Sequence, residues 1–349
     1  MKLERGVLQM KKGFGKKVFA AICVALILFA CIKIIPLFTE YFSDSAYDGS
    51  ERVFTVEKGS NYKSIGQKLE DENILKSKYT FMIKYRMNSS EYGEFKYGDY
   101  VLKGDMSLDD IIKTLTSNPM SGNVITVTIP EGFSVDLIAQ RMENSGICTY
   151  DEFIDAAKKD IYNYEFLKFS QNPDSIYKLE GFLFPDTYEF YDVITAEGVI
   201  NAMLSKFESV YLETVGSYDN FYKIMTIASL IEREAELSSE RPVISGVIYN
   251  RLGIDMLLQI DASVIYGKTY GKYDMEVVLN KDLEDDSKYN IYKNKGLPPG
   301  PICNPGKESI YAAANPVSHD YLYYHTDENK NDGSHIFTKT FDEHLETMN

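Results

Sequence analysis

The segment Phe221–Glu236, FYKIMTIASLIEREAE, carries the clearest helical pattern in the chain. Its apolar residues recur at 224, 227, 228, 231 and 235, the spacing of a helix that packs on one side. Glu232 follows the apolar run directly, and the residues one turn earlier on its face are small. Partial burial there would raise the pKa of its carboxyl, as a general acid requires. The pattern alone also fits a solvated glutamate, and it favours Glu232 no more than Glu234 or Glu236.

Four other segments combine amides, carboxyls and tyrosines with rigid turns. They are LEGFLFPDTY at 179–188, VIYNRL at 247–252, LQIDASVIYG at 258–267 and YNIYKNKGLPPGPICNPG at 289–306. Four of the eleven prolines lie within 297–306, which predicts a rigid loop. Polar groups and aromatic faces held by rigid turns are typical of a sugar site. The alternative is that they are ordinary turns and core tyrosines, because the chain has 27 tyrosines.

The N-terminus predicts a membrane anchor. Residues 18–38, VFAAICVALILFACIKIIPLF, contain one charge, Lys33, and as a helix they would span about 30 Å, the thickness of the hydrocarbon core. Residues 1–17 carry six basic side chains against one acid, which predicts a cytoplasmic tail and places 39–349 outside the cytoplasm. A cleaved signal peptide or a lipoprotein signal fits less well, because the apolar run continues past Cys31. We therefore expect a single-pass protein of the cell membrane.

Composition excludes several classes of protein. The chain has 349 residues, 44% hydrophobic and 26% charged, with a net charge of -15. These values are typical of a globular protein and argue against nucleic acid as a partner, since phosphate binding favours a basic face. No CxxC pair occurs, and the histidines at 319, 325, 335 and 344 fit no zinc motif. We expect no metal, no cofactor and structural roles for the histidines.

An internal repeat organises the part after the anchor. Residues 55–69 align without gaps with residues 128–142, at an offset of 73, and each copy predicts a strand, a glycine turn and a helix. The first copy resembles a LysM-like module, a small fold that commonly binds cell-wall glycan. Its two open interpretations are glycan retention near the membrane and a rigid spacer.

These observations predict an α+β protein with five parts. A cytoplasmic tail (1–17) precedes a transmembrane helix (18–38) and a linker (39–51). A small LysM-like α/β domain (52–120) follows, and a mixed α/β catalytic domain with a helix-borne glutamate occupies 121–349.

The motifs in this order resemble the endolytic murein transglycosylase family (MltG, YceG-like). The resemblance rests on the ASLIERE helix, the four segments above and a closing run from Ala312 to Phe337, and it covers roughly residues 53–345. There are two departures. The family's usual D-P-T is Asp261-Ala262-Ser263 here, and tryptophans often seen in the LEG segment are Phe182 and Phe184.

The resemblance implies a lyase that cuts peptidoglycan strands internally, with Glu232 as its catalytic residue. One carboxyl would protonate the oxygen between MurNAc and GlcNAc and then deprotonate the 6-hydroxyl, which closes a 1,6-anhydro ring. No second protein carboxylate is then obligatory, unlike in most glycoside hydrolases. We also expect six polar residues to line one groove with Glu232, namely Glu180, Tyr188, Asn250, Gln259, Asp261 and Asn290.

The implied partners are peptidoglycan glycan strands, the plasma membrane and cell-wall synthases, and the implied role is termination of strand elongation. Two other functions stay open. A muramidase would use the same glutamate with water and leave reducing ends, whereas a cell-wall-binding scaffold would lack activity.

Overall fold

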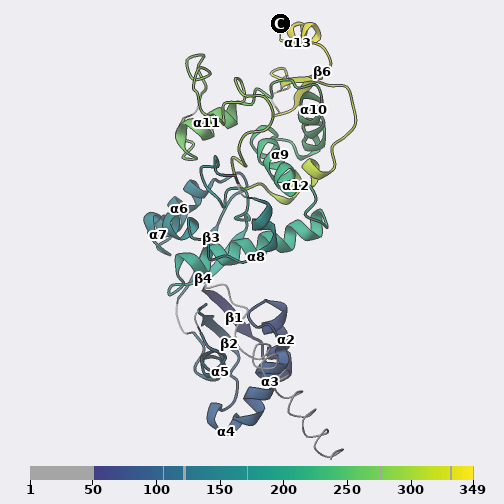
Figure 1. Ribbon diagram of the computed structural model, residues 1–349. Coiled ribbons are helices and arrows are strands. Elements are labelled where there is room, and N and C mark those ends of the chain that lie inside the picture. Colours follow the sequence, from purple (N-terminus) through teal and green to yellow (C-terminus); the bar gives the residue numbers. More distant parts are fainter. Residues whose placement is uncertain are drawn as a thin grey trace, which may run out of the picture. The chain divides into compact units, whose positions relative to one another are not determined.

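The computed structural model describes residues 51–348 except 105, 121–122, 171, 276 and 331 (Figure 1). The described residues form two compact units, 54–120 in the first and 51–53 with 123–348 in the second. The predicted tail, anchor and nearly all of the linker lie outside the described residues. Within the described part, no helix combines the length and the apolar character needed to cross a membrane.

The first unit is built around one apolar core. Strands β1 (Arg52–Val56) and β2 (Gly98–Leu102) pair, and α2 (Tyr62–Asp71), α3 (Lys78–Met87), α4 (Ser89–Tyr92) and α5 (Leu108–Thr116) complete it. Asn61 caps α2 and Ser107 caps α5, because each side chain accepts a hydrogen bond from the first helical turn. The largest core side chains are fully buried: Phe54, Leu69, Ile74, Phe81 and Tyr100. The LysM-like nature of this unit stays a prediction.

The internal repeat is confirmed as a repeat of structure. In the first unit β1 leads through Gly59, at φ +86°, into α2. In the second unit β3 (Val124–Thr128) leads through Gly132, at φ +80°, into α6 (Val135–Asn144). Both glycines occupy the left-handed region, which other residues enter at a cost, so the turn requires glycine. The two strands nevertheless have different partners, β2 for β1 and β4 (Thr187–Tyr191) for β3.

The second unit is mostly helical, with two small antiparallel sheets. Val124 of β3 pairs with Tyr191 of β4, and β5 (Tyr323–Thr326) pairs with β6 (His335–Thr338). The remaining elements are α7 (Tyr150–Ala157), η1 (Glu165–Phe169), α8 (Ala196–Thr214), α9 (Phe221–Glu234), η2 (Ser238–Glu240), α10 (Arg241–Gly253), α11 (Asp261–Thr269), α12 (Lys307–Ala314) and α13 (Phe341–Thr347). The chain is thus a mixed α/β protein, as predicted.

Helix α9 is the central element, packed against α10 and α12 (Figure 1). The predicted apolar face is confirmed, since positions 224, 227, 228, 231 and 235 are all buried. The helix ends at Glu234, two residues earlier than the sequence pattern suggested, because Ala235 is extended. The proline-rich loop is fixed to the middle of α9, where the Ser229 hydroxyl accepts a hydrogen bond from the N–H of Ile302 at 3.0 Å.

Candidate active site

Glu232 lies in a buried ion-pair network. Its Oε1 is 3.5 Å from Nη2 of Arg241, and its Oε2 accepts a hydrogen bond from the N–H of Gly306 at 2.9 Å. The Glu232 and Arg241 side chains are only 6% and 9% exposed. Gly306 is the N-cap of α12, so the carboxylate satisfies one of the free N–H groups at that helix end. Both oxygens of Glu232 are therefore engaged in joining three helices.

Arg241 extends this network at the start of α10. Its guanidinium donates to Ser309 Oγ at 3.0 Å and pairs with Glu308 at 3.1 Å. Glu131, from the turn after β3, completes the surroundings, because a Cβ at Gly306 would collide with its carboxylate. Burial and the charge of Glu232 raise the pKa of Glu131. We call Glu232, Arg241 and the N–H of Gly306 the Arg241 network.

Glu234, two residues further on, has a different environment. Its Oε2 accepts a hydrogen bond from the Tyr324 hydroxyl at 2.8 Å. The pKa of Glu234 is raised to about 7, chiefly by burial and in part by the negative charge of Asp261, and the hydrogen bond from Tyr324 opposes the rise. Its position at the carboxyl end of α9 also raises the pKa of Glu234, because the helix dipole is negative there. This carboxyl is thus poised between its acid and base forms near neutral pH.

The first residue of α11, Asp261, and the segment before the prolines supply further groups of the site around Glu234. The Tyr292 hydroxyl donates to Oδ1 of Asp261 at 2.6 Å. Burial, Asp261 and Glu234 all raise the pKa of Tyr292, so it remains a hydrogen-bond donor. The N–H of Gln259 donates to the carbonyl of Ile291 at 3.2 Å, which joins the two loops. We call Glu234, Tyr324, Asp261 and Tyr292 the tyrosine–carboxyl site.

Two of the predicted wall residues, Asn290 and Gln259, belong to the segments that carry Tyr292 and Asp261. Asn290 is fully buried, and its amide donates to the carbonyls of Leu283 and Asp285 while its oxygen accepts the N–H of Tyr292 at 3.1 Å. It therefore positions Tyr292. Gln259 is exposed and holds φ at +53°, an uncommon conformation for a residue with a side chain and one that occurs often at functional sites.

The other three predicted wall residues make mainly internal contacts. Glu180 is 1% exposed and accepts hydrogen bonds from the N–H of Val135, the Tyr266 hydroxyl and the Asn304 amide. Burial raises the pKa of Glu180 to about 8. The Tyr188 hydroxyl donates to the Phe184 carbonyl at 2.6 Å. Glu180 thus joins the LEG segment to α6 and α11, and the Tyr188 hydroxyl bonds within the LEG segment itself.

Asn250 supports the strand that carries Tyr324. Its amide donates to the carbonyls of His319 and Tyr321 at 2.8 and 3.0 Å. Its neighbour Arg251 donates to the carbonyls of Leu258 and Leu322, both at 2.6 Å. This pair on α10 therefore holds the segment before Asp261 and the segment before Tyr324 in place.

Four residues of this region were missed as site residues: Glu234, Arg251, Tyr292 and Tyr324. All four lie inside motifs that the sequence singled out, so the motif was the available signal. The structure joins Gln259, Asp261 and Asn290 to the tyrosine–carboxyl site through Ile291 and Tyr292, and it gives Glu232 a separate set of partners.

The histidines make protein contacts. His319 bonds the Val243 carbonyl through Nε2 at 2.9 Å, and Nδ1 of His335 lies 2.7 Å from Glu240. The rings of His325 and His344 lie 5.1 Å apart. Among the described residues, no group of three or more histidine, cysteine, aspartate and glutamate side chains is arranged to hold a metal ion.

Comparison with known proteins assigns the chain to a class. The model of the YceG-like family matches residues 54–349, and the chain belongs to that family. A crystal structure of a yceG-like protein from Listeria monocytogenes has the same fold, with a TM-score of 0.55 and 30% identity. That match covers 85% of this chain and 99% of the Listeria chain.

Two curated relatives carry the name endolytic murein transglycosylase. The protein of Bacillus subtilis is 38% identical over 310 residues, which covers 83% of this chain and 81% of the relative. The protein of Streptococcus pneumoniae strain R6 is 33% identical over 300 residues, which covers 78% of this chain and 53% of the relative. The chain thus matches about half the length of the pneumococcal relative.

Proposed function

We propose that this protein is an endolytic murein transglycosylase, a lyase that cuts the glycan strands of peptidoglycan at internal positions. The sequence relatives of that name support the activity and the substrate class. The observation that carries the mechanism is the Glu234 carboxyl, whose pKa of about 7 suits a group that must both give and take a proton.

Glu234, rather than Glu232, is the acid in this proposal. A general acid must be protonated in part at working pH and must have an oxygen free to reach the substrate. Glu232 has both oxygens engaged, by Arg241 and by Gly306. Glu234 has one oxygen held by Tyr324, which fixes the carboxyl and leaves the other oxygen for the glycosidic bond.

The reaction then runs in two steps. Glu234 donates its proton to the oxygen between MurNAc and GlcNAc, the bond from that oxygen to C1 of MurNAc breaks, and positive charge develops on the MurNAc ring. The Glu234 carboxylate next takes the proton of the 6-hydroxyl while that oxygen bonds to C1. The products are a free GlcNAc hydroxyl and a 1,6-anhydro-MurNAc end, and the enzyme recovers its proton. The negative charge of Asp261 near Glu234 would stabilise the developing positive charge.

A muramidase is the second candidate, and one observation favours it. Two carboxyl groups, Glu234 and Asp261, lie close enough to influence one another, and paired carboxyls are the usual equipment of glycoside hydrolases. Water would then attack C1 in place of the 6-hydroxyl. The two reactions differ in their products, since a reducing end is heavier by one water than an anhydro end.

Digestion of purified glycan strands by the full-length protein tests the proposal. Mass spectrometry of the fragments should show anhydro-MurNAc ends, and fragments several disaccharides long should appear early, because cuts fall inside strands. Reducing ends would support the muramidase, and intact strands beside an active control enzyme would contradict both.

The location and partners are part of the proposal. The apolar run at 18–38 and its basic flank support a single-pass anchor with the two units outside the cytoplasm. Such a protein would meet nascent strands beside cell-wall synthases, where a cut terminates elongation. A reporter fused after residue 349 should be active outside the cytoplasm, and activity only inside would refute the orientation.

The first unit is proposed as a LysM-like glycan binder. The separate expression of residues 52–120 and a pull-down on insoluble murein would test it. Retention on murein supports glycan binding, and a freely soluble fraction supports the spacer.

A further inference from the structure

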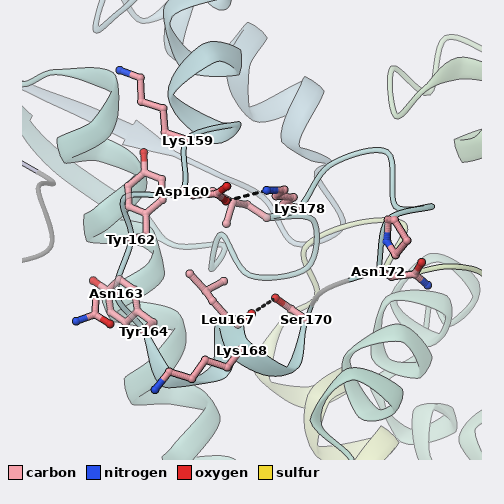
Figure 2. Close-up of a pocket in the computed structure, with 12 residues that line it drawn as sticks. Lys159, Asp160, Tyr162, Asn163, Tyr164, Leu167, Lys168, Ser170, Asn172 and Lys178 are labelled. Carbon is pink, nitrogen blue, oxygen red and sulfur yellow. Dashed lines mark hydrogen bonds and ion pairs between the residues drawn. The ribbon is translucent and has the colours of Figure 1, made fainter.

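A pocket of about 570 Å³ opens in the second unit, and its lining includes neither glutamate of α9 (Figure 2). Its volume lies within the range of small-ligand sites. The walls come from the segment after α7, from η1 and from the segment that leads to Leu179. The lining residues used below are Lys159, Asp160, Tyr164, Lys168, Asn172 and Lys178.

The pocket is rich in positive charge although the chain is acidic. Lys159, Lys168 and Lys178 line it together with one carboxylate, that of Asp160. The ammonium group of Lys159 pairs with Glu197, so Lys168 and Lys178 are the cations open to a ligand. Lys178 pairs with Asp160 at 2.7 Å, but the two side chains are 64% and 80% exposed. An exposed pair of this kind contributes little, so a ligand carboxylate can replace Asp160 at low cost. Lys168 has no ion pair among the described residues.

The walls between the lysines are rigid. The Tyr164 hydroxyl donates to the side-chain oxygen of Asn201 at 2.9 Å, and the ring is buried. The Asn172 amide donates to the Pro299 carbonyl at 2.6 Å, which joins the rim of the pocket to the proline-rich loop. That loop ends at Gly306 beside α9. One rigid segment therefore links the pocket to the helix that carries the candidate acid.

We propose that this pocket binds an acidic peptide, and that the peptide is the stem attached to the glycan strand. Carboxylates of such a stem would accept hydrogen bonds from the lysine ammonium groups, and its amides would meet the polar wall. A neutral sugar chain would gain little from the ammonium groups of Lys168 and Lys178. The identity of the peptide as a murein stem rests on the proposed function, whereas the binding of an acidic peptide does not.

Calorimetry with a free stem peptide, released from murein by an amidase, tests the binding directly. The double variant Lys168→Gln, Lys178→Gln should bind about tenfold more weakly than the wild type, a change of about 1.4 kcal/mol. Lys281→Gln, an exposed lysine elsewhere in the same unit, is the matched control and should bind like the wild type. The wild type should also bind the peptide weakly once its carboxyl groups are amidated.

Equal affinity of the wild type and the double variant would overturn the proposal. So would equally tight binding of inorganic phosphate, which would indicate a general anion site. The exchanged lysines are solvent-accessible, and circular dichroism of the variants verifies that the fold is retained.

Cleavage assays separate this proposal from the proposed function. On strands that carry stems, the double variant should show a raised KM and an unchanged kcat. On strands stripped of stems, it should match the wild type. If the wild type cut neither substrate, the transglycosylase proposal would fail, and the calorimetric result would still decide whether the pocket binds acidic peptides. A loss of cleavage on both substrates by the double variant would contradict a stem-specific pocket.

Discussion

Helix α9 carries two glutamates, two residues apart, in regions of opposite character. Glu232 belongs to the Arg241 network, where a cation and a helix end neutralise its charge. Glu234 belongs to the tyrosine–carboxyl site, where burial and a second carboxyl favour its protonated form. Two residues along a helix correspond to a rotation of about 200°, so each side chain meets a different set of elements. In the proposed mechanism, the charge of the surroundings, and not the residue type, is what separates a structural carboxyl from a catalytic one.

The largest expected difference between the two regions is in the rate of cleavage. Glu234→Gln removes the proton that both steps use, so kcat/KM on glycan strands should fall about 10³–10⁴-fold. Glu232→Gln leaves that proton in place, so its kcat/KM per folded molecule should stay within about tenfold of the wild type. Initial rates measured at equal concentrations of folded protein test this pair.

The same substitution at Glu234 should stabilise the protein relative to the wild type as the pH rises from 5 to 8. The folded-state pKa of Glu234 is raised from 4.5 to about 7, so folding favours the protonated form. Its contribution is full below pH 4.5 and is lost as the pH rises toward 7. Glu234→Gln does not titrate at this position. The difference in free energy of unfolding between the variant and the wild type should therefore shift in favour of the variant from pH 5 to pH 8, by at most about 3 kcal/mol. Urea denaturation at both pH values measures this gain, and a constant difference would contradict the raised pKa.

In the Arg241 network, substitution of Glu232 should lower the free energy of unfolding. Glu232→Gln leaves the buried Arg241 short of one counter-charge, although Glu308 still pairs with Arg241 and the glutamine oxygen can still accept the N–H of Gly306. We expect a loss of about 1–3 kcal/mol in the free energy of unfolding, less than for a buried pair with no other partner. Glu308→Gln is the control. Its side chain is 65% exposed, so its loss should stay below about 1 kcal/mol. Equal losses of stability for Glu232→Gln and Glu308→Gln would show that burial of the ion pair does not increase its contribution to stability.

The smallest expected effects are opposite shifts in the pH dependence of kcat/KM. Activity should decline as Glu234 deprotonates, on a limb near pH 7. Asp261→Asn removes a negative charge that raises the pKa of Glu234, so this limb should move to lower pH. Tyr324→Phe removes a hydrogen bond that lowers this pKa, so the limb should move to higher pH. Shifts in the same direction would contradict the assignment of the limb to Glu234, and Glu308→Gln should not move it.

The sequence predicted the scaffold of the site better than its chemistry. Periodicity identified the buried face of α9, and the repeat identified the turn at Gly132, because both depend on neighbouring residues. The choice between Glu232 and Glu234 depends on Arg241, Gly306, Asp261 and Tyr324, up to 90 residues away, and no local pattern contains that information. Glu180 and Asn250 illustrate the same limit, since they bond donors and carbonyls that are distant in sequence. Their place in a groove stays a prediction.

A pH titration of the glutamate carboxyl carbons by NMR tests the central claim most directly. The full-length protein, labelled with ¹³C-glutamate, is compared with Glu234→Gln and Glu232→Gln. We predict a carboxyl that titrates near pH 7 in the wild type and in Glu232→Gln, and whose signal is missing in Glu234→Gln. A signal near pH 7 that disappears in Glu232→Gln and persists in Glu234→Gln would contradict the account, as would a Glu234 carboxyl that titrates near 4.5.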